Sequence, residues 1–292
     1  MKKLLTIVSS KDNKITTETF AVIRDYLKVV IKSKWLDNEK ACEIYFDSDK
    51  NVLLDELVNY FNTHLYDWAY QNAEEKYKSV FISDMDSTII KQECIDEIAD
   101  LANVKEEVED ITRSAMQGEV AFAEALEKRV GLLKGIKLEL LNKIYDKIEF
   151  NDGAEKLLIN LNKQKIKTIL VSGGFTFFTE KISEELNFQE NYANSLEVID
   201  GTLTGKVIPP IIDSISKKKI LKNTIDSLRI KSSEVVAIGD GANDLEIIRD
   251  AGLGISYKGK QILKASANGQ IEHTDLCSLL YFIGLPKDKI IT

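Results

Sequence analysis

From residue 79 onward, short apolar runs alternate with stretches of helical periodicity. The runs are apolar at consecutive positions, which is typical of strands buried on both faces of a sheet: Ser79–Ser83, Thr168–Ser172, Val235–Gly239 and Leu253–Ser256. The helical stretches are Ala154–Lys163, Phe175–Leu186, Lys217–Leu228 and Asn243–Ala251. This alternation predicts an α/β fold built on a doubly wound parallel sheet.

A long helical block interrupts this alternation between the first and second apolar runs. From Cys94 to about Asp146, apolar residues recur at i, i+3 and i+4 spacing without a strand-like run. We therefore expect a helical cap over residues 93–149, inserted into a core made of residues 76–92 and 150–292.

The first 75 residues form a separate pattern, which predicts a small α/β N-terminal domain. Its expected elements are a strand at Leu4–Val8, a helix at Thr17–Val30, a strand at Ala41–Phe46 and a longer helix at Leu53–Tyr70. The polar run Gln71–Lys76 then reads as a helix end or a linker. No motif in this region assigns it a role.

Composition excludes several classes of protein. The 39 Lys and Arg against 47 Asp and Glu give a net charge of −8, without the basic cluster that a nucleic-acid binder needs. No run approaches the ~18 apolar residues of a membrane span. The three cysteines, Cys42, Cys94 and Cys277, are widely spaced and indicate neither a disulfide framework nor a zinc site. A reducing cytoplasm is the expected location.

Two carboxylates, Asp84 and Asp86, follow the first core strand directly. In doubly wound sheets ligands bind outside the carboxyl ends of the strands. Two carboxylates at a buried strand end repel each other unless a cation or a proton relieves them. The D-x-D pair also suits solvated loop aspartates or the metal site of some glycosyltransferases, so by itself it leaves these alternatives open.

Two further strand ends carry polar groups. Ser172, Gly173 and Gly174 precede a helical stretch, an arrangement that can cradle an anion or simply form a tight turn. The third loop nearly matches the dinucleotide fingerprint, but it places Asp240 and Asp244 where a pyrophosphate would lie. That repulsion favours a metal site over a nucleotide site.

Together the three loops and a lysine-rich segment, Lys217 to Lys219, supply four carboxylates, an anion cradle and positive charge. Mg²⁺ prefers oxygen ligands and commonly keeps a substrate phosphate among them. A carboxylate can attack phosphorus when a metal and a lysine neutralise the charge between them. The sequence therefore predicts magnesium-dependent phosphoryl transfer through an aspartyl phosphate.

These motifs resemble the haloacid dehalogenase-like phosphatases in four ordered segments: Asp84–Thr88, Ser172–Gly174, Lys217 and Gly239–Asp244. Within that superfamily the chain is similar to the phosphoserine phosphatases, through the blocks Glu93–Ala99 and Ser172–Phe178. The resemblance runs from about residue 79 to 283 and implies a haloacid dehalogenase-like core with an inserted cap.

The resemblance implies a role for each matching residue. Asp84 would be the nucleophile, and Asp86 the acid that protonates the leaving oxygen and then the base that activates water. Asp84, the backbone carbonyl of Asp86 and Asp240 would hold Mg²⁺, with Asp244 close behind. The phosphate would be bound by a further set: Ser172, Gly173, Gly174, Lys217 and Asn243. The alignment to Ile220 and Leu221 selects Lys217 among three adjacent lysines.

The resemblance also implies a substrate, L-phosphoserine, and a place as the last step of serine biosynthesis. Glu93 and Arg129 match the family's contacts to the substrate's ammonium and carboxylate, and a planar guanidinium suits a carboxylate well. Met116 and Phe122 match apolar cap positions that would exclude water.

Other functions stay open at this point. The same motifs would serve a phosphotransferase that passes the phosphoryl group to an alcohol such as homoserine, or a phosphatase for a different small phosphomonoester. A regulatory module with a vestigial site is disfavoured by the intact set of carboxylates. Some relatives carry a regulatory or dimerising segment before the core, so a homodimer through residues 1–75 is a further expectation.

Overall fold

The computed structural model describes residues 1–50, 53, 55–116 and 119–291. Its strands form one eleven-stranded sheet in the order β2-β3-β1-β4-β11-β10-β9-β5-β6-β7-β8. The strands are β1 (Lys2–Ser9), β2 (Lys32–Asp37), β3 (Ala41–Asp47), β4 (Tyr66–Asn72), β5 (Val80–Ser83), β6 (Lys167–Phe175), β7 (Glu190–Ile199), β8 (Thr202–Ile208), β9 (Val235–Gly239), β10 (Leu253–Tyr257) and β11 (Gly269–Ile271).

Six neighbouring strands, from β11 to β7, run parallel and form the core of the molecule. Successive residues of β5 point to opposite faces, so Phe81 packs into one apolar layer and Ile82 into the other. Helices α7 (Ala154–Lys163), α8 (Thr176–Leu186) and α12 (Ser278–Phe282) cover the first layer. Helices α9 (Ser214–Leu228), α10 (Leu245–Asp250) and α11 (Gln261–Lys264) cover the second. The predicted doubly wound parallel sheet is confirmed.

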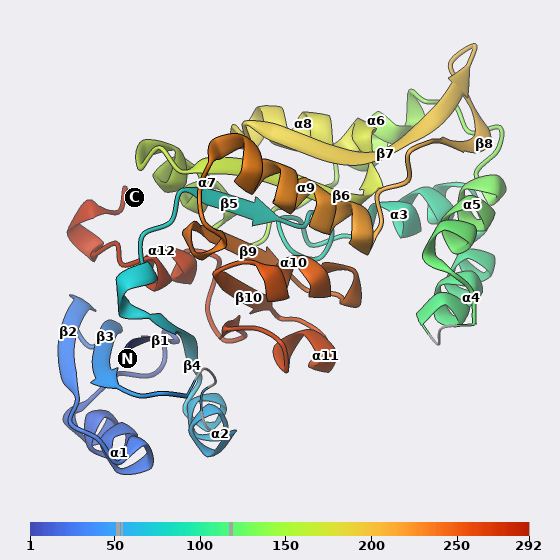
Figure 1. The fold of residues 1–292 in the computed structure, drawn as a ribbon. Coiled ribbons are helices and arrows are strands. Elements are labelled where there is room, and N and C mark those ends of the chain that lie inside the picture. The colour runs from blue at the N-terminus through green and yellow to red at the C-terminus, as the bar shows by residue number, and fades with distance from the viewer. Residues whose placement is uncertain (51–52, 54, 117–118, 292) are drawn as a thin grey trace.

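The cap region is helical, as expected. It contains α3 (Cys94–Leu101), α4 (Lys105–Met116), α5 (Phe122–Leu132) and α6 (Leu140–Tyr145), and α3 to α5 lie beyond the carboxyl end of β5 (Figure 1). An unpredicted hairpin, β7–β8, reaches over to the cap. There Gly135 N–H donates to the Leu203 carbonyl at 2.9 Å, and Leu203 N–H donates to the Ile136 carbonyl at 2.8 Å.

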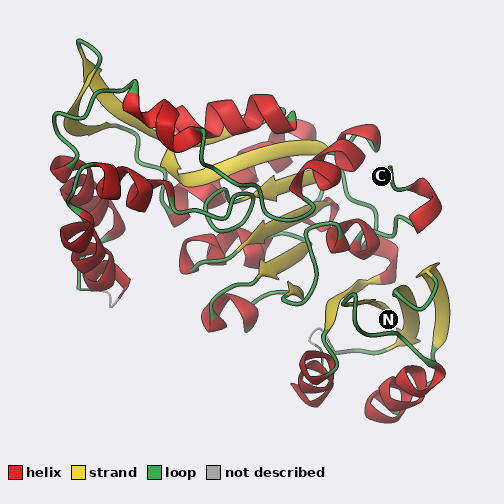
Figure 2. Cartoon of the chain, turned by 180° about the vertical axis from the view of Figure 1, so that it is seen from behind, coloured by secondary structure: helices red, strands yellow, loops and turns green. Residues whose placement is uncertain are grey.

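Residues 1–75 contain four antiparallel strands in the order β2-β3-β1-β4. Two helices, α1 (Thr17–Leu27) and α2 (Asp55–Thr63), lie on one side of these strands (Figure 2). The expectation of a single helix over Leu53–Tyr70 was wrong. Leu65 adopts a positive φ of 54° after α2, and β4 begins at the next residue. Tyr66, Trp68 and Tyr70 alternate in the period of a strand and pack on the helices. The expected linker at Gln71–Lys76 contains the end of β4 and a short 3₁₀ turn, Ala73–Glu75.

The N-terminal strands join the core through β4 and β11, which pair antiparallel at Ala69 with Gly269 and at Trp68 with Gln270. The buried carboxylate of Asp67 reinforces this join. It accepts hydrogen bonds from three successive backbone N–H groups of residues 272–274, at 2.8, 3.0 and 2.9 Å.

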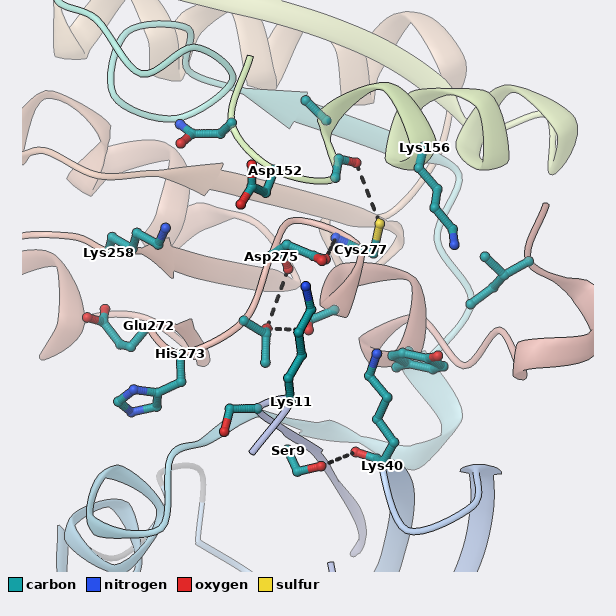
Figure 3. Close-up of a pocket in the computed structure, with 18 of the residues that line it drawn as sticks. Ser9, Lys11, Lys40, Asp152, Lys156, Lys258, Glu272, His273, Asp275 and Cys277 are labelled. Carbon is teal, nitrogen blue, oxygen red and sulfur yellow. Dashed lines mark hydrogen bonds between the residues drawn. The ribbon is translucent and has the colours of Figure 1, made fainter. Parts of the chain in front are cut away.

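A cavity of about 800 Å³ lies beside this join, and Figure 3 shows its side chains. Lys40 reaches it from the N-terminal strands, whereas Lys156, Asp152 and Asp275 come from the core. None of the residues lining this cavity belongs to the loops that follow β5, β6 and β9. Among the described residues, no helix is long and apolar enough to cross a membrane.

Candidate active site

Three loops meet at one edge of the sheet, because β6, β5 and β9 are adjacent and parallel. Asp84 and Asp86 follow β5, Ser172 to Gly174 lie at the end of β6, and Asp240 follows β9. The sequence placed these residues at strand ends, and the strand order brings those ends together. A backbone hydrogen bond of 3.1 Å from Asp84 N–H to the Ile238 carbonyl fixes the first loop against β9.

Lys217, on the first turns of α9, lies between two of the carboxylates. Its Nζ donates to Oδ1 of Asp84 at 2.8 Å and to Oδ1 of Asp244 at 2.7 Å, and all three side chains are buried. Burial by itself would lower the pKa of Lys217, but the charges of Asp244 and Asp84 raise it above its usual value. Lys217 is therefore an ammonium ion. Its neighbour Lys218 instead pairs with Glu246 and Asp250 at the surface.

Asp84, Asp240 and Asp244 bring carboxylate oxygens within 4.8 Å of one another. Desolvation, and next the charge of Asp84, raises the pKa of Asp240 to about 6 and that of Asp244 to about 8. If all three carboxyl groups are ionised, the one ammonium ion of Lys217 leaves two negative charges without a counter-charge. A divalent cation would balance them, and carboxylate oxygens are the ligands that hard divalent cations prefer. The residues present thus fit a divalent metal ion.

Gly239 makes this cluster sterically possible. A Cβ atom at residue 239 would lie 2.3 Å from Oδ2 of Asp244, a distance that real carbon atoms do not reach. The glycine therefore lets the carboxylate of Asp244 pack against the end of β9.

Asp86 lies beside the cluster and has its own partners. Its Oδ1 accepts from Cys94 N–H at 2.9 Å, and its Oδ2 accepts from the Ser172 hydroxyl at 3.2 Å. Desolvation, followed by the charges of Glu93 and Asp84, raises its pKa to about 7. Such a carboxyl group can hold a proton near neutral pH and release it, which is the property of a general acid and base.

The Ser172–Gly174 segment forms a bulge next to Asp86. Gly174 N–H donates to Oγ of Ser172 at 2.8 Å. A Cβ atom at residue 174 would lie 2.7 Å from Oδ2 of Asp86, so only glycine allows this approach. Across the cluster, Nδ2 of Asn243 donates to Oδ2 of Asp84 at 3.2 Å.

A cavity of about 350 Å³ opens above these loops, and the cap forms its other wall. Glu93 stands at its rim, where Ser87 donates to its carboxylate at 2.6 Å. Desolvation, followed by the charges of Asp240 and Asp84, raises the pKa of Glu93 to about 7. The predicted residues Arg129 and Phe122 line the cavity as well. Met116 is the last residue of α4, and its side chain lies outside the part of the chain that the structure describes.

Three cavity residues with polar or charged side chains were not predicted as site residues: Asp96, Thr112 and Lys260. Nη1 of Arg129 donates to the hydroxyl of Thr112 at 3.3 Å, so α4 orients the guanidinium that α5 carries. The helical spacing of Asp96 and Thr112 placed both in the cap, but no motif marked either as facing the cavity.

Comparisons with known proteins show the family of the chain. The family model described as haloacid dehalogenase-like hydrolase matches residues 78–252. The chain is 42% identical over 211 residues to the phosphoserine phosphatase of Archaeoglobus fulgidus, a match that covers 72% of this chain and 61% of that one. It is 43% identical over 201 residues to the phosphoserine phosphatase of Idiomarina loihiensis, covering 69% of this chain and 91% of the relative.

The likeness to one solved structure extends over nearly the whole chain. A probable phosphoserine phosphatase from Vibrio cholerae, in unliganded form, superposes with a TM-score of 0.78 at 28% identity. The superposition covers 98% of this chain and 88% of that one, so it includes the N-terminal strands, which the family-model match to residues 78–252 leaves out.

Proposed function

Because the chain belongs to the haloacid dehalogenase-like hydrolases and, within them, to the phosphoserine phosphatase family, we propose that it hydrolyses L-phosphoserine to L-serine and phosphate. One observation carries the proposal. The cavity of about 350 Å³ has Asp84 and Asp86 on one wall and Glu93 and Arg129 on the other. The carboxylate and the ammonium group of phosphoserine would complement Arg129 and Glu93 on the cap wall, while its phosphate would reach the wall that carries Asp84 and Asp86. The reaction would be the last step of serine biosynthesis.

In the first step a carboxylate oxygen of Asp84 attacks phosphorus and the bond from phosphorus to the serine oxygen breaks. Its electron pair goes to the serine oxygen, which takes the proton of Asp86. The raised pKa of Asp86 supports this role, because the carboxyl group holds a proton near neutral pH. The product on the enzyme is an aspartyl phosphate.

In the second step water attacks phosphorus and gives its proton to Asp86. The bond between phosphorus and Asp84 breaks, so phosphate leaves and both carboxyl groups return to their starting states. Phe122 and the other cap residues that line the cavity would exclude bulk water while the serine group is bound.

The remaining site residues would bind and orient the phosphoryl group. The Ser172 hydroxyl, the N–H groups of Gly173 and Gly174, and the ammonium of Lys217 are donors for its oxygens, with Asn243 at the edge. Asp84, Asp240, Asp244 and the backbone carbonyl of Asp86 would hold Mg²⁺. When bound, Mg²⁺ supplies positive charge that reduces repulsion between the nucleophile and the phosphoryl oxygens.

On the cap wall, Arg129 would bind the substrate carboxylate and Glu93 the ammonium group. The hydrogen bond from Arg129 to Thr112 supports this assignment, because it holds the guanidinium at the cavity. Met116 would add an apolar contact from the end of α4.

The decisive experiment is a phosphate-release screen over phosphorylated amino acids and sugars with Mg²⁺ present. We expect phosphoserine to have the highest kcat/KM. If a phosphorylated sugar had the highest kcat/KM, the substrate would be another small phosphomonoester.

Product analysis with and without an acceptor alcohol such as homoserine separates hydrolysis from phosphotransfer, since only transfer yields a phosphorylated alcohol.

The domain organisation belongs to the same proposal. Residues 76–292 would form the phosphatase domain, with its core at 76–92 and 150–292 and its cap at 93–149. Residues 1–75 would form a small N-terminal domain.

A cytoplasmic location is supported by three free cysteines. Light scattering of the full chain would test for the expected homodimer through residues 1–75.

A further inference from the structure

Strand β6 leaves its ladder with β7 at the phosphate-binding segment proposed above. Val171 pairs with Tyr192 and Phe175 pairs with Asn194, so β6 advances by four residues while β7 advances by two. Three residues, Ser172 to Gly174, therefore lie opposite a single residue of β7, and the segment bulges out of the sheet. Their backbone groups need partners other than those of a regular ladder.

The side chain of Asn194 supplies such a partner. Its Nδ2 donates to the carbonyl of Gly173 at 2.8 Å, and the side chain is fully buried at 0% exposure. The same amide also bonds to the backbone of Ile212. Ile212 N–H donates to Oδ1 at 2.7 Å, and Nδ2 also donates to the Ile212 carbonyl at 3.4 Å. Within a side-chain amide only the oxygen can accept from an N–H group, so this contact defines the orientation of the amide.

Ile212, which bonds to the amide of Asn194, lies shortly before Lys217 in the chain. The next residue, Asp213, is the N-cap of α9, and its Oδ1 accepts from Ser216 N–H at 2.8 Å. Ser216 in turn donates through its hydroxyl to the Ile211 carbonyl at 2.9 Å. The start of α9 is therefore fixed relative to Ile212, and Lys217 follows within the first turns of the helix.

We propose that Asn194 is a positioning residue that sets the spacing between the Ser172–Gly174 bulge and the amino end of α9. It thereby holds the hydroxyl and N–H donors of the bulge at a fixed distance from the ammonium of Lys217. This inference rests on the proposed function, in which both groups bind the same phosphoryl oxygens. Donors stabilise a transition state only when they already point at its charge, and a displacement of about 1 Å can reduce turnover about 100-fold.

The chain contains a matched control. Asn160 on α7 is also fully buried and makes the same three kinds of bond. Ile291 N–H donates to its Oδ1 at 2.8 Å, and its Nδ2 donates to the carbonyls of Lys156 at 2.8 Å and Ile291 at 3.1 Å. These bonds hold the C-terminal segment, which lies on the side of the core away from the cap (Figure 1). A variant of Asn160 that loses these bonds therefore lacks as many hydrogen bonds as a variant of Asn194, but the bonds lie outside the candidate active site.

The experiment compares Asn194→Leu with Asn160→Leu in the full chain. Leucine has the same four branched side-chain heavy atoms as asparagine, although it is bulkier, and it can form none of the three hydrogen bonds. We expect similar losses of thermal stability in the two variants. At a temperature where both are folded, Asn194→Leu should lower kcat about 100-fold on phosphoserine and equally on p-nitrophenyl phosphate. KM for phosphoserine should change less than threefold, because the cap binds the serine group. Asn160→Leu should stay within about twofold of wild type.

A second readout does not depend on turnover. Inorganic phosphate with Mg²⁺ should raise the Tm of wild type and of Asn160→Leu, and the rise should be absent in Asn194→Leu. If Asn194→Leu fails to fold, Asn194→Ala, which leaves room for water at the lost bonds, takes its place in both measurements.

The outcomes separate this inference from the substrate assignment. Equal kcat values for the Asn194 and Asn160 variants, together with equal phosphate shifts, would overturn the positioning role. A chain that acts on p-nitrophenyl phosphate but not on phosphoserine would overturn the proposed substrate while still reporting on Asn194. A loss confined to phosphoserine would also contradict the inference, because it would place the effect of Asn194 on the serine group.

Discussion

The ammonium of Lys217 lies 2.8 Å from Oδ1 of Asp84, the residue proposed as the nucleophile. The same ammonium bonds Asp244 at 2.7 Å, so one cation serves two buried carboxylates. The two carboxyl groups thus share a single ammonium group, and with Asp240 nearby the cluster has more acidic groups than basic ones.

Replacing Lys217 with methionine should therefore destabilise the protein strongly. We expect Lys217→Met to lower the free energy of unfolding by about 3–5 kcal/mol, the range for removing one partner of a buried ion pair. Lys218→Met is the control, since its carboxylate partners are exposed and such pairs contribute about 0–1 kcal/mol. Urea unfolding measures both, and equal losses would contradict the charge balance described for the cluster.

The two aspartates after β5 should fail at different steps. Asp84→Asn should abolish turnover and leave the fold intact, because an amide cannot attack phosphorus. Asp86→Asn should also be inactive, but it should accumulate phosphate on Asp84, because the base for the second step is missing. Intact-protein mass spectrometry detects that adduct. An Asp84→Asn enzyme with more than a small fraction of wild-type rate would remove Asp84 as nucleophile.

Removal of the divalent cation should stop the reaction. We expect exhaustive chelation to abolish phosphate release and added Mg²⁺ to restore it. Ca²⁺ should inhibit, because it accepts more ligands at longer distances and can engage both oxygens of Asp84. Full activity in the chelated enzyme would exclude a required metal.

Selectivity should depend on Arg129. We expect Arg129→Ala to lower kcat/KM for phosphoserine by about 2–4 kcal/mol, because a charged group would lose its partner in a closed cavity. p-Nitrophenyl phosphate lacks that carboxylate, so its kcat/KM should hardly change. Arg113, which is exposed on α4 and pairs with Asp110, provides the control variant Arg113→Ala. Equal losses on the two substrates would assign Arg129 to the fold instead.

A buried lysine outside the site should make stability depend on pH. Lys78 is 2% exposed, and its ammonium donates to the carbonyls of Glu75 and Ser233, both at 2.7 Å. Desolvation lowers its pKa from 10.5 to about 8, so above pH 8 the folded chain binds fewer protons than the unfolded chain. The burial of Lys78 therefore lowers the free energy of unfolding below pH 8, and this loss disappears as the pH rises toward 10.5.

The comparison with Lys78→Met isolates that ionisation. Between pH 7 and 9.5 the stability of wild type relative to the variant should increase by about 2 kcal/mol. Chemical unfolding at several pH values measures the difference. Parallel curves for the two proteins would show that Lys78 stays equally protonated in the folded and unfolded states.

The core and most of the site could be predicted because burial leaves a direct mark on sequence. A strand covered on both faces is apolar at every position, and Val235–Gly239 appears in the structure with the bounds that its pattern predicts. Such strands end abruptly at carboxylates, which locates Asp84 and Asp240. Their proximity then follows from the parallel sheet.

Strands with only partial burial were missed. β2 is an edge strand with four exposed residues at its start, including Lys32 and Lys34, so it lacks an apolar run. β7 is mostly half-buried and polar. β4 follows α2 so closely that its aromatic residues read as a continuation of the helical pattern.

The positioning role of Asn194 could not have been predicted from one sequence. An asparagine between alanine and serine carries no motif. Its contacts depend on the register shift between β6 and β7 and on where the chain enters α9. Both are properties of the folded sheet.

The pairing of β4 with β11 gives residues 1–75 a mechanical connection to the core. A module on a flexible tether swings about a hinge, whereas a module whose strands belong to the same sheet can move only by sliding or twisting along those strands. The pairing requires glycine at residue 269, since a Cβ atom there would lie 2.6 Å from the carbonyl oxygen of Trp68. A force on the N-terminal strands would therefore be transmitted as shear through β11 and β10 to β9 and to the loop that carries Asp240 and Asp244.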